Sequence, residues 1–195
     1  MSWQIVRLAD VVPQAWKNGG GSTRELLAWP SGADWRVRLS VATVMADGPF
    51  SHFEGVQRWF AVLQGDGVRL SVDGTATELR AASPPFSFAG AAQTSCALLG
   101  GPTLDFNLML RGATGQLLRV NQQYSQKTDD LLIDNTIIFA ACYAINTSIV
   151  SIFNQNKLVL APGTLAWQLL DQQSAINGEG WSVESGNALW MGIRL

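Results

Sequence analysis

Hydrophobic and polar residues alternate with a period of two through much of the chain, which is the pattern of strands with one buried face. The alternation is clearest over 35–42, where an apolar face opposes one with two arginines: Trp35, Val37, Leu39 and Val41 against Arg36, Arg38, Ser40 and Ala42. Shorter apolar runs follow at 58–63, 68–72, 78–79, 86–88, 96–99 and 105–110. The pattern therefore predicts a series of short strands.

Turn residues separate these runs at close intervals. Gln64-Gly65-Asp66-Gly67 closes one run, and Asp73-Gly74 has the composition of a two-residue hairpin turn. The second half of the chain has further apolar runs at 137–152, 157–160, 165–170 and 188–195, with a turn at Asn146 and Thr147. The best candidate for a helix, and a short one, is 128–136. We therefore predict an all-β protein built as a sandwich or as barrels, with little helix.

The composition of the chain changes near residue 115, where Gly112-Ala113-Thr114-Gly115 is a candidate junction. Lysine and arginine become rare after it, and Gln, Asn and Ser become common. A chain of 195 residues is long enough for one or two compact domains. We therefore expect domains at 1–115 and 116–195, with exchange of strands between the two left open.

Charge and cysteine content exclude several classes of partner. Charged residues make up 14% of the chain and the net charge is −2, so no basic field is present to hold nucleic acid or an anionic membrane surface. No stretch has the ~20 apolar residues of a membrane-spanning helix, and none at the N-terminus resembles a signal peptide. Cys96 and Cys142 lie in apolar runs, without metal-binding or redox spacing. Two buried free thiols suit the reducing cytoplasm, where we expect the protein.

Three consecutive glycines, Gly19-Gly20-Gly21, follow Trp16, Lys17 and Asn18 and precede Ser22-Thr23-Arg24. Glycine loses more backbone freedom on folding than any other residue, so we expect at least one of the three to adopt a positive φ near the mouth of the first barrel. The indole, amide, hydroxyl and guanidinium groups around them can together hold a small polar ligand. Two interpretations stay open: a loop that faces a ligand, and a tight loop that only leads into the next strand.

Arginines on strands raise a second question, because burying an unpaired charge in a barrel is costly. Glu25, Asp47 and Asp105 are candidate partners within the chain, so internal ion pairs that brace the barrel are one interpretation. The other gives Arg36 or Arg58 a bidentate contact with the carboxylate of a small ligand. The remaining candidates for this ligand site are Asn18, Gly20, Thr23, Phe50, Ser51 and Asn107, with Asp47 and Asp105 in support.

Residues 47–65 resemble the first motif of the cupin superfamily, whose closing glycine matches Gly65. In metal-binding cupins this motif carries two histidines separated by one residue, and a glutamate seven residues before the closing glycine. Arg58 stands at the position of that glutamate, and His52 is the only histidine of the chain. One imidazole with no second histidine or carboxylate makes a poor divalent-metal site. We therefore expect no metal, no other cofactor and a surface role for His52.

More specifically, the chain resembles the HutD/Ves family over roughly residues 3–112. The matching segments, in the family's order, are 16–25, 35–40, 47–51, Arg58 with Gly65, 85–90 and 101–109. The resemblance implies a bicupin, in which two jelly-roll type barrels are formed and the second is degenerate. It also implies a link to histidine degradation in some members. For such members the resemblance implies a non-enzymatic regulator that senses an intermediate such as urocanate or a formylated or formiminated glutamate.

Together these features favour a metal-free protein that binds a small carboxylate and regulates histidine utilisation. Two alternatives stay open: a metal-free cupin enzyme, an isomerase or hydrolase acting on a small carboxylate, and a structural or partner-binding module. No nucleophile–base pair is visible in the sequence, which favours a binding protein over an enzyme. We expect no nucleic acid or membrane partner, and we expect a homodimer.

Overall fold

The computed structural model describes residues 3–121, 124–127, 137–152, 156–170 and 180–195. Strands account for every regular element of these residues except one turn of 3-10 helix, η1 (Leu8–Asp10). The prediction of an all-β chain with little helix is therefore confirmed. The short helix expected at 128–136 lies outside the described residues.

The chain divides into two compact units, which we call the N-terminal barrel (Val11–Gly112) and the C-terminal barrel (Met1–Asp10 with Ala113–Leu195). The division falls within the junction expected at 112–115. The first ten residues group with the second half of the chain, although the sequence pattern placed them with the first. They do so because β1 (Gln4–Arg7) pairs antiparallel with β17 (Thr164–Leu170).

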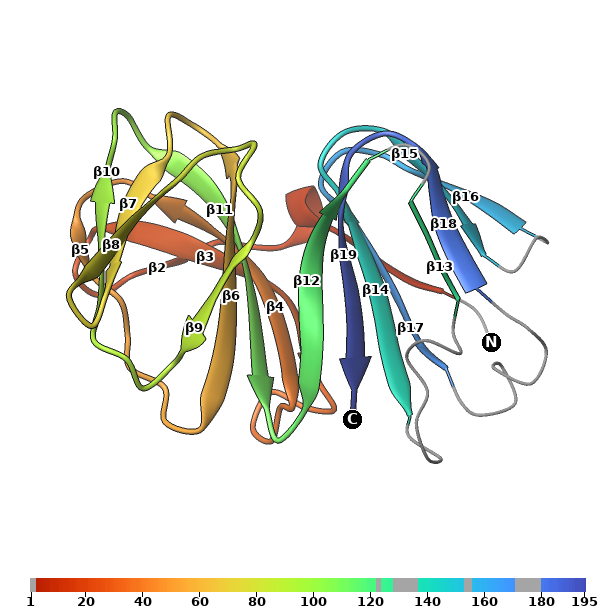
Figure 1. The fold of residues 1–195 in the computed structure, drawn as a ribbon, viewed down its shortest axis with the longest axis horizontal. Helices are drawn as coiled ribbons and strands as arrows, with labels where there is room; N and C mark the ends of the chain where they lie inside the picture. The colour runs from red at the N-terminus through yellow and green to blue at the C-terminus, as the bar shows by residue number, and fades with distance from the viewer. Residues whose placement is uncertain (1–2, 122–123, 128–136, 153–155, 171–179) are drawn as a thin grey trace. The chain divides into compact units, whose positions relative to one another are not determined.

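Two antiparallel sheets form the N-terminal barrel (Figure 1). The larger one has the order β2 (Gln14–Ala15), β3 (Gly21–Trp29), β4 (Val37–Val44), β11 (Thr103–Arg111), β6 (Val56–Gln64) and β9 (Phe86–Ala89). The smaller one has the order β5 (Gly48–Pro49), β10 (Thr94–Leu98), β7 (Val68–Val72) and β8 (Thr75–Leu79). Apolar side chains from both sheets, among them Phe60, Leu70 and Cys96, share one buried cluster. The two sheets therefore close on a common core.

The C-terminal barrel repeats this plan with a five-stranded and a four-stranded sheet. The five-stranded sheet has the order β1, β17, β14 (Ile138–Ala144), β19 (Ala188–Arg194) and β12 (Thr114–Val120). The four-stranded sheet has the order β13 (Tyr124–Lys127), β18 (Gly180–Ser185), β15 (Ser148–Ile152) and β16 (Asn156–Leu160). Every residue of β14 is buried, as its unbroken apolar sequence predicts for a central strand. Its Cys142 packs in the core with Trp190 of β19.

Turn chemistry fixes the ends of several strands. Asp73 and Gly74 have φ values of 47° and 82°, the left-handed conformation that a two-residue hairpin between β7 and β8 requires. Gly65 has a φ of 98°, and a Cβ there would lie 2.7 Å from the carbonyl oxygen of Pro102. Both turns predicted from the sequence are therefore confirmed, and Gly65 is needed for conformation and for space.

Strand β4 buries both of its faces. Val37, Leu39 and Val41 on the apolar face are at most 1% exposed. The opposite face, with Arg38 and Ser40, lines a cavity inside the N-terminal barrel. The sequence pattern thus identified the two faces, and the more polar one faces the interior.

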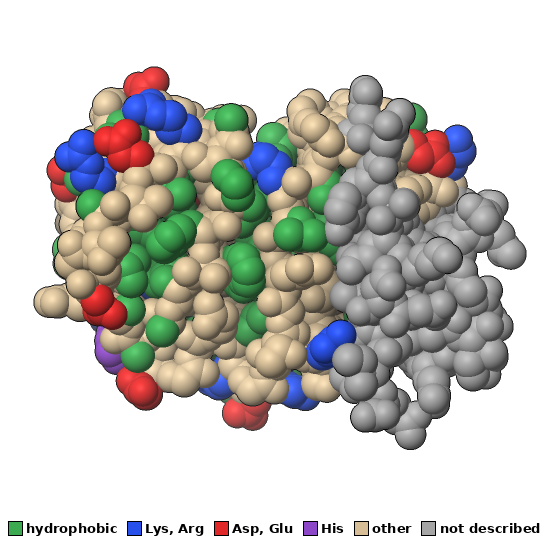
Figure 2. Space-filling model, in the orientation of Figure 1, with side chains coloured by type: hydrophobic (Ala, Val, Ile, Leu, Met, Phe, Trp, Pro, Cys, Tyr) green, Lys and Arg blue, Asp and Glu red, His purple; other side chains and the backbone are tan. Residues whose placement is uncertain are grey.

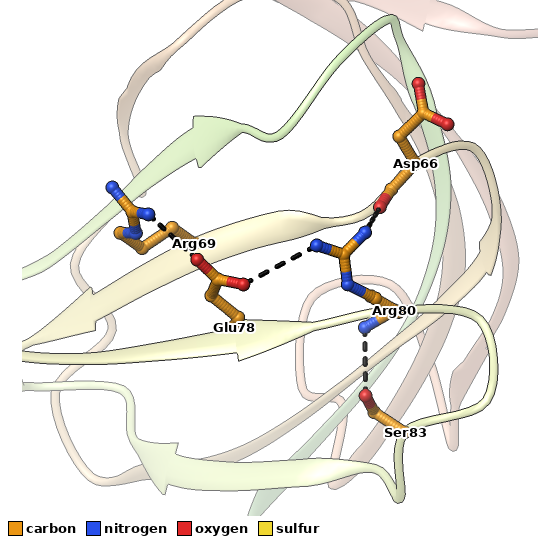
Figure 3. A network of polar contacts seen from close by, with 5 residues as sticks. All are labelled: Asp66, Arg69, Glu78, Arg80 and Ser83. Atoms are coloured by element: carbon orange, nitrogen blue, oxygen red, sulfur yellow. Dashed lines mark hydrogen bonds and ion pairs between the residues drawn. The ribbon is translucent and has the colours of Figure 1, made fainter.

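Charged side chains on the surface of the N-terminal barrel pair with one another. Glu78 accepts a 2.8 Å hydrogen bond from Arg69 Nη2, and Arg80 Nη2 lies 3.5 Å from its second oxygen (Figure 3). In Figure 2 red and blue side chains lie together at the end of this unit that holds β7 and β8. The hydrogen bond from Arg69 holds the pKa of Glu78 below its usual value. Such exposed pairs add little stability.

Candidate functional site

A cavity of about 780 Å³ lies within the N-terminal barrel. Strands β4, β11 and β6 contribute its floor, because alternate side chains of each strand point to the same side of the sheet. The backbone register arranges these side chains in rows, each with a β11 residue between partners on β4 and β6: Arg38, Met109 and Arg58, then Ser40, Asn107 and Phe60. The floor therefore combines two cations, an amide and a hydroxyl with apolar surface.

Arg58 is the most unusual group of this floor, since it is only 7% exposed. Its guanidinium carbon lies 5.2, 5.5 and 4.9 Å from the ring centres of Phe50, Phe53 and Phe88. Nη1 donates a 3.2 Å hydrogen bond to the carbonyl oxygen of Ser51, and the buried Nε has no partner within the described ranges. Within the described residues, no carboxylate oxygen lies within 4.0 Å of this guanidinium.

The pKa of Arg58 is lowered from 12.5 to about 10. Burial is the main cause, and repulsion from the charge of Arg38 makes a smaller contribution to the same shift. Arg58 therefore remains a cation at neutral pH. Contacts with aromatic rings offset part of the cost of burying a cation, but they do not neutralise it. A planar carboxylate placed in the cavity would supply the missing anion with matching geometry.

Arg38, in the same row, is compensated. Its Nε donates a 2.6 Å hydrogen bond to Oε2 of Glu25 on β3, which forms an ion pair. The prediction that arginines of the barrel form internal ion pairs is therefore confirmed for Arg38. Its partner, Glu25, is one of the three carboxylates expected from the sequence. The two arginines of the cavity thus differ: among the described residues, Arg38 has a carboxylate partner and Arg58 has none.

The glycine loop forms part of the rim. Trp16, Lys17 and Asn18 line the cavity, and Trp16 Nε1 donates a 2.8 Å hydrogen bond to Oγ1 of Thr23, which also lines it. Gly19 has a φ of 71°, so the predicted positive φ within the three glycines is confirmed. A Cβ on Gly21 would collide with a neighbouring carbonyl oxygen, and its closest other contact is the ring of Trp16. The glycines therefore serve to hold the loop against the cavity.

Of the residues that the sequence nominated for a ligand site, six line the cavity: Asn18, Thr23, Phe50, Ser51, Arg58 and Asn107. Three others lie elsewhere. The N–H of Gly20 donates to Oδ1 of Asn18. Arg36 Nη2 donates to the carbonyl oxygen of Gly112. Asp47 Oδ1 accepts a 2.8 Å hydrogen bond from the N–H of Leu98. The guanidinium of Arg36 is thus held by backbone, and only Arg58 of the two proposed anchors reaches the cavity.

Asp105 is also outside the cavity lining, although it lies on the inward face of β11, two residues from Asn107. Its side chain is fully buried, and Oδ2 accepts a 2.7 Å hydrogen bond from Thr103 Oγ1. Oδ1 has no partner in the part of the chain that the structure describes. Burial raises its pKa from 3.8 to about 7. Burial, with a further contribution from the charge of Asp105, raises the pKa of the Cys96 thiol to about 12. Asp105 is therefore a buried core carboxyl group that does not line the cavity.

Four important lining residues were not nominated from the sequence: Arg38, Ser40, Phe60 and Met109. Period-two alternation could have identified most of them, because Arg38 and Ser40 share a strand face and Met109 shares one with Asn107. The place of Trp16 beside the glycine loop can be read from the sequence. Its hydrogen bond to Thr23 cannot, because the bond depends on how the folded loop brings the two side chains together. Phe60 had no signal beyond its place in an apolar run.

The donor groups of the cavity do not fit a divalent metal ion. No histidine or carboxylate is among its lining residues, and Arg58 brings a positive charge to the place where the metal-binding motif has glutamate. Over the parts of the chain that the structure describes, no three His, Cys, Asp or Glu side chains gather into a metal-binding group. His52 has a 60% exposed side chain that lies 3.1 Å from Glu54, so its expected surface role is confirmed.

Comparison with known proteins identifies the family. The sequence model of the HutD family matches residues 8–181. The chain belongs to the HutD family. A protein of Pseudomonas putida described as an uncharacterized 21.2 kDa protein in the hutC 3′ region is 38% identical over 151 residues, which are 74% of this chain and 77% of that protein. Protein Ves of Citrobacter koseri is 36% identical over 98 residues, 49% of this chain and 51% of that protein.

Solved structures agree with this HutD assignment. HutD from Pseudomonas fluorescens SBW25 superposes with a TM-score of 0.77 at 27% identity and covers 100% of both chains. Oxalate decarboxylase from Lactobacillus farciminis superposes with a TM-score of 0.62 at 8% identity, over 100% of this chain and 86% of that one, which is evidence for the fold alone. The predicted cupin-like fold with two barrels is confirmed. Among the described residues of this HutD-family chain, no helix has the length and apolar character needed to cross a bilayer.

Proposed function

We propose that this HutD-family protein binds a small carboxylate in the cavity of its N-terminal barrel, with Arg58 as the anchor. The observation that carries the proposal is the charge of Arg58. It is a buried cation in a cavity wall, it is close to Arg38, and it has no carboxylate partner among the described residues. A ligand carboxylate would offset the cost of burying the Arg58 cation without an anion. The contact between that carboxylate and Arg58 would therefore contribute strongly to binding.

Neutral groups around Arg58 provide the remaining contacts of the proposed complex. Asn107 and Ser40 can donate or accept hydrogen bonds on the floor, and Thr23 and Asn18 can do so at the rim. Met109, Phe50 and Phe60 offer apolar surface to the body of the ligand. A few convergent polar groups on an apolar wall are typical of sites for small organic molecules.

A regulatory role in histidine utilisation is the second part of the proposal. It is supported by membership of the HutD family and by the Pseudomonas putida relative, whose description places it in the hutC 3′ region. An intermediate of the pathway, such as urocanate or a formylated or formiminated glutamate, has the required carboxylate. The two free, buried cysteines suit a cytoplasmic location, which is also part of the proposal.

The composition of the cavity favours a binding protein over an enzyme. Among the described residues, the charged side chains that line it are the basic ones of Lys17, Arg38 and Arg58. General acid–base catalysis commonly uses His, Asp, Glu or Tyr within hydrogen-bond reach of the substrate, and none of these lines the cavity. Asp105, whose pKa is near neutrality, lies outside the lining.

The test is a thermal-shift screen with urocanate, formylglutamate, formiminoglutamate and histidine, followed by calorimetric titration of the best ligand. Loss of a charge-assisted bidentate contact should weaken binding by roughly ten- to a hundredfold in Arg58→Ala. Arg58→Lys should lose almost as much, because an ammonium group cannot reproduce the planar fork. Arg36→Ala and Arg36→Lys are matched controls, since Arg36 lies outside the cavity. Unchanged affinity in folded Arg58 variants would overturn the proposal.

A further inference from the structure

The cavity contains two arginines in one row, and the part of the chain that the structure describes supplies a carboxylate partner to only one of them. Arg38 and Arg58 are both in register with Met109, so their Cα atoms lie two strand spacings apart, roughly 10 Å. Glu25 Oε2 lies 2.6 Å from Arg38 Nε, whereas Arg58 has no carboxylate partner among the described residues. The charge that the cavity presents at its floor is therefore close to one positive unit, although it has two guanidinium groups.

The geometry of the Arg38 pair leaves part of its guanidinium for a ligand. Glu25 accepts from Nε and is not among the residues that line the cavity, while Arg38 is. A guanidinium has five N–H donors and no acceptor, so its remaining Nη groups can donate to a ligand oxygen or nitrogen. Arg38 can therefore donate a hydrogen bond to an acceptor at one end of a small ligand whose other end contacts Arg58.

We propose that the Glu25–Arg38 pair sets the charge of the ligand, so that the cavity selects a molecule with one carboxylate, held by Arg58, and a neutral acceptor group held by Arg38. This inference rests on the proposed function, because it assigns the second end of the same ligand. A second carboxylate at Arg38 would approach a guanidinium that already has an anionic partner, and it would be repelled by Glu25. An amide oxygen or an unprotonated ring nitrogen can accept the same hydrogen bond without that repulsion. Of the intermediates named above, urocanate has this pattern, whereas the formylated and formiminated glutamates carry two carboxylates and are disfavoured by this inference.

Lys17 does not change this balance. It lies on the rim and is exposed to solvent, so its charge is screened much more strongly than those of the two arginines. It can attract anions to the mouth of the cavity in general. The discrimination between one and two carboxylates is assigned to the more buried Arg38 and its partner.

The experiment compares isosteric ligands that differ only in the charge of one end: glutarate with glutaramate, and succinate with succinamate. Calorimetric titration of the wild-type protein should show the monoamide of each pair binding roughly tenfold more tightly than the diacid. Glu25→Gln keeps the size of the side chain and removes its charge. In that variant the diacid should gain about tenfold in affinity while the monoamide changes little, so the preference disappears.

Two variants complete the design. Glu78→Gln is the matched control, because Glu78 also pairs with arginine but lies outside the cavity, and it should leave the preference unchanged. Arg38→Gln leaves Glu25 without its partner beside the ligand, so the diacid should lose more affinity than the monoamide. This variant also tests the inference if Glu25→Gln does not fold.

Failure of the inference is distinguishable from failure of the proposed function. If the probes bind and depend on Arg58, but diacid and monoamide bind equally to the wild type or Glu25→Gln keeps the wild-type preference, the inference alone is overturned. If none of the probes binds, or binding is independent of Arg58, the proposed function fails and the inference fails with it.

Discussion

The indole N–H of Trp16 donates a 2.8 Å hydrogen bond to the side-chain oxygen of Thr23. Trp16 precedes the three glycines and Thr23 lies on β3 after them, so the bond closes the loop across its base. Both residues also line the cavity, and the backbone N–H of Trp16 donates to the carbonyl oxygen of Gly21. The rim of the cavity and the conformation of the glycine loop are therefore maintained by the same contacts.

Thr23→Val should destabilise the protein by about 1 kcal/mol, because it removes the acceptor of this hydrogen bond while keeping the shape of the side chain. Thr23→Ser retains the hydroxyl and should lose clearly less. Urea unfolding followed by tryptophan fluorescence measures both values. Equal destabilisation by the two substitutions would show that the methyl group, and not the hydrogen bond, supports the loop.

Gly21→Ala should destabilise by roughly 1–3 kcal/mol, because its Cβ would meet the backbone oxygen of Thr43 and the ring of Trp16. Gly101→Ala is the control, since Gly101 has open space around its Cβ position and no positive φ. That substitution should change stability by less than about 1 kcal/mol. Chemical denaturation of both variants tests the contrast, and a similar loss in each would contradict the close approach at Gly21.

Arg58→Met should raise the stability of the ligand-free protein, because it replaces a buried cation without a carboxylate partner by an apolar side chain of similar length. A gain of about 1 kcal/mol corresponds to a rise in Tm of roughly 2–4 °C for a protein of this size. The same variant should lose ligand binding. Arg69→Met, which removes an exposed paired arginine, should leave Tm nearly unchanged. A lower Tm in Arg58→Met would show that the aromatic contacts outweigh the burial of the charge.

Asp105 should make stability depend on pH between about 4 and 7. Its pKa in the folded protein is raised from 3.8 to about 7, so the folded state binds a proton that the unfolded state has already released in this interval. The stabilising contribution is complete below pH 4 and is lost as the pH rises to 7. In Asp105→Asn this loss should be absent, so the variant should gain stability relative to the wild type as the pH rises. Unfolding curves measured at several pH values test this slope, and identical slopes would contradict the raised pKa.

Period-two alternation and turn chemistry were enough to predict most strands of the fold. Strands β4, β7 and β14 follow directly from their apolar patterns, and Asp73-Gly74 marks its hairpin. Strand β1 gave no such signal, since it is short and none of its residues is buried. Its place depends on pairing with β17, and contacts so distant along the chain are not encoded in a local pattern.

The candidate site was only partly predictable, for reasons that Arg36 and Arg38 illustrate. Alternation places both on one face, but β4 begins at Val37, so Arg36 lies beyond the strand and turns to the carbonyl oxygen of Gly112. The pairing of Arg38 with Glu25 depends on how β3 lies against β4, and that register shifts just after Glu25. Sequence pattern can thus nominate charged residues of a barrel interior, but the register of neighbouring strands decides which remain without a partner.

The pairing of β1 with β17 affects the order in which the protein can be completed during synthesis. Gln4 leaves the ribosome about 160 residues before its partner Trp167. At roughly 5–20 residues per second this delay is about 8 to 30 s. Residues 11–112 contain every strand of their own unit and can fold during this time, whereas β1 has to wait for the second half of the chain. The cavity of the earlier unit can therefore form before the second unit has been synthesised.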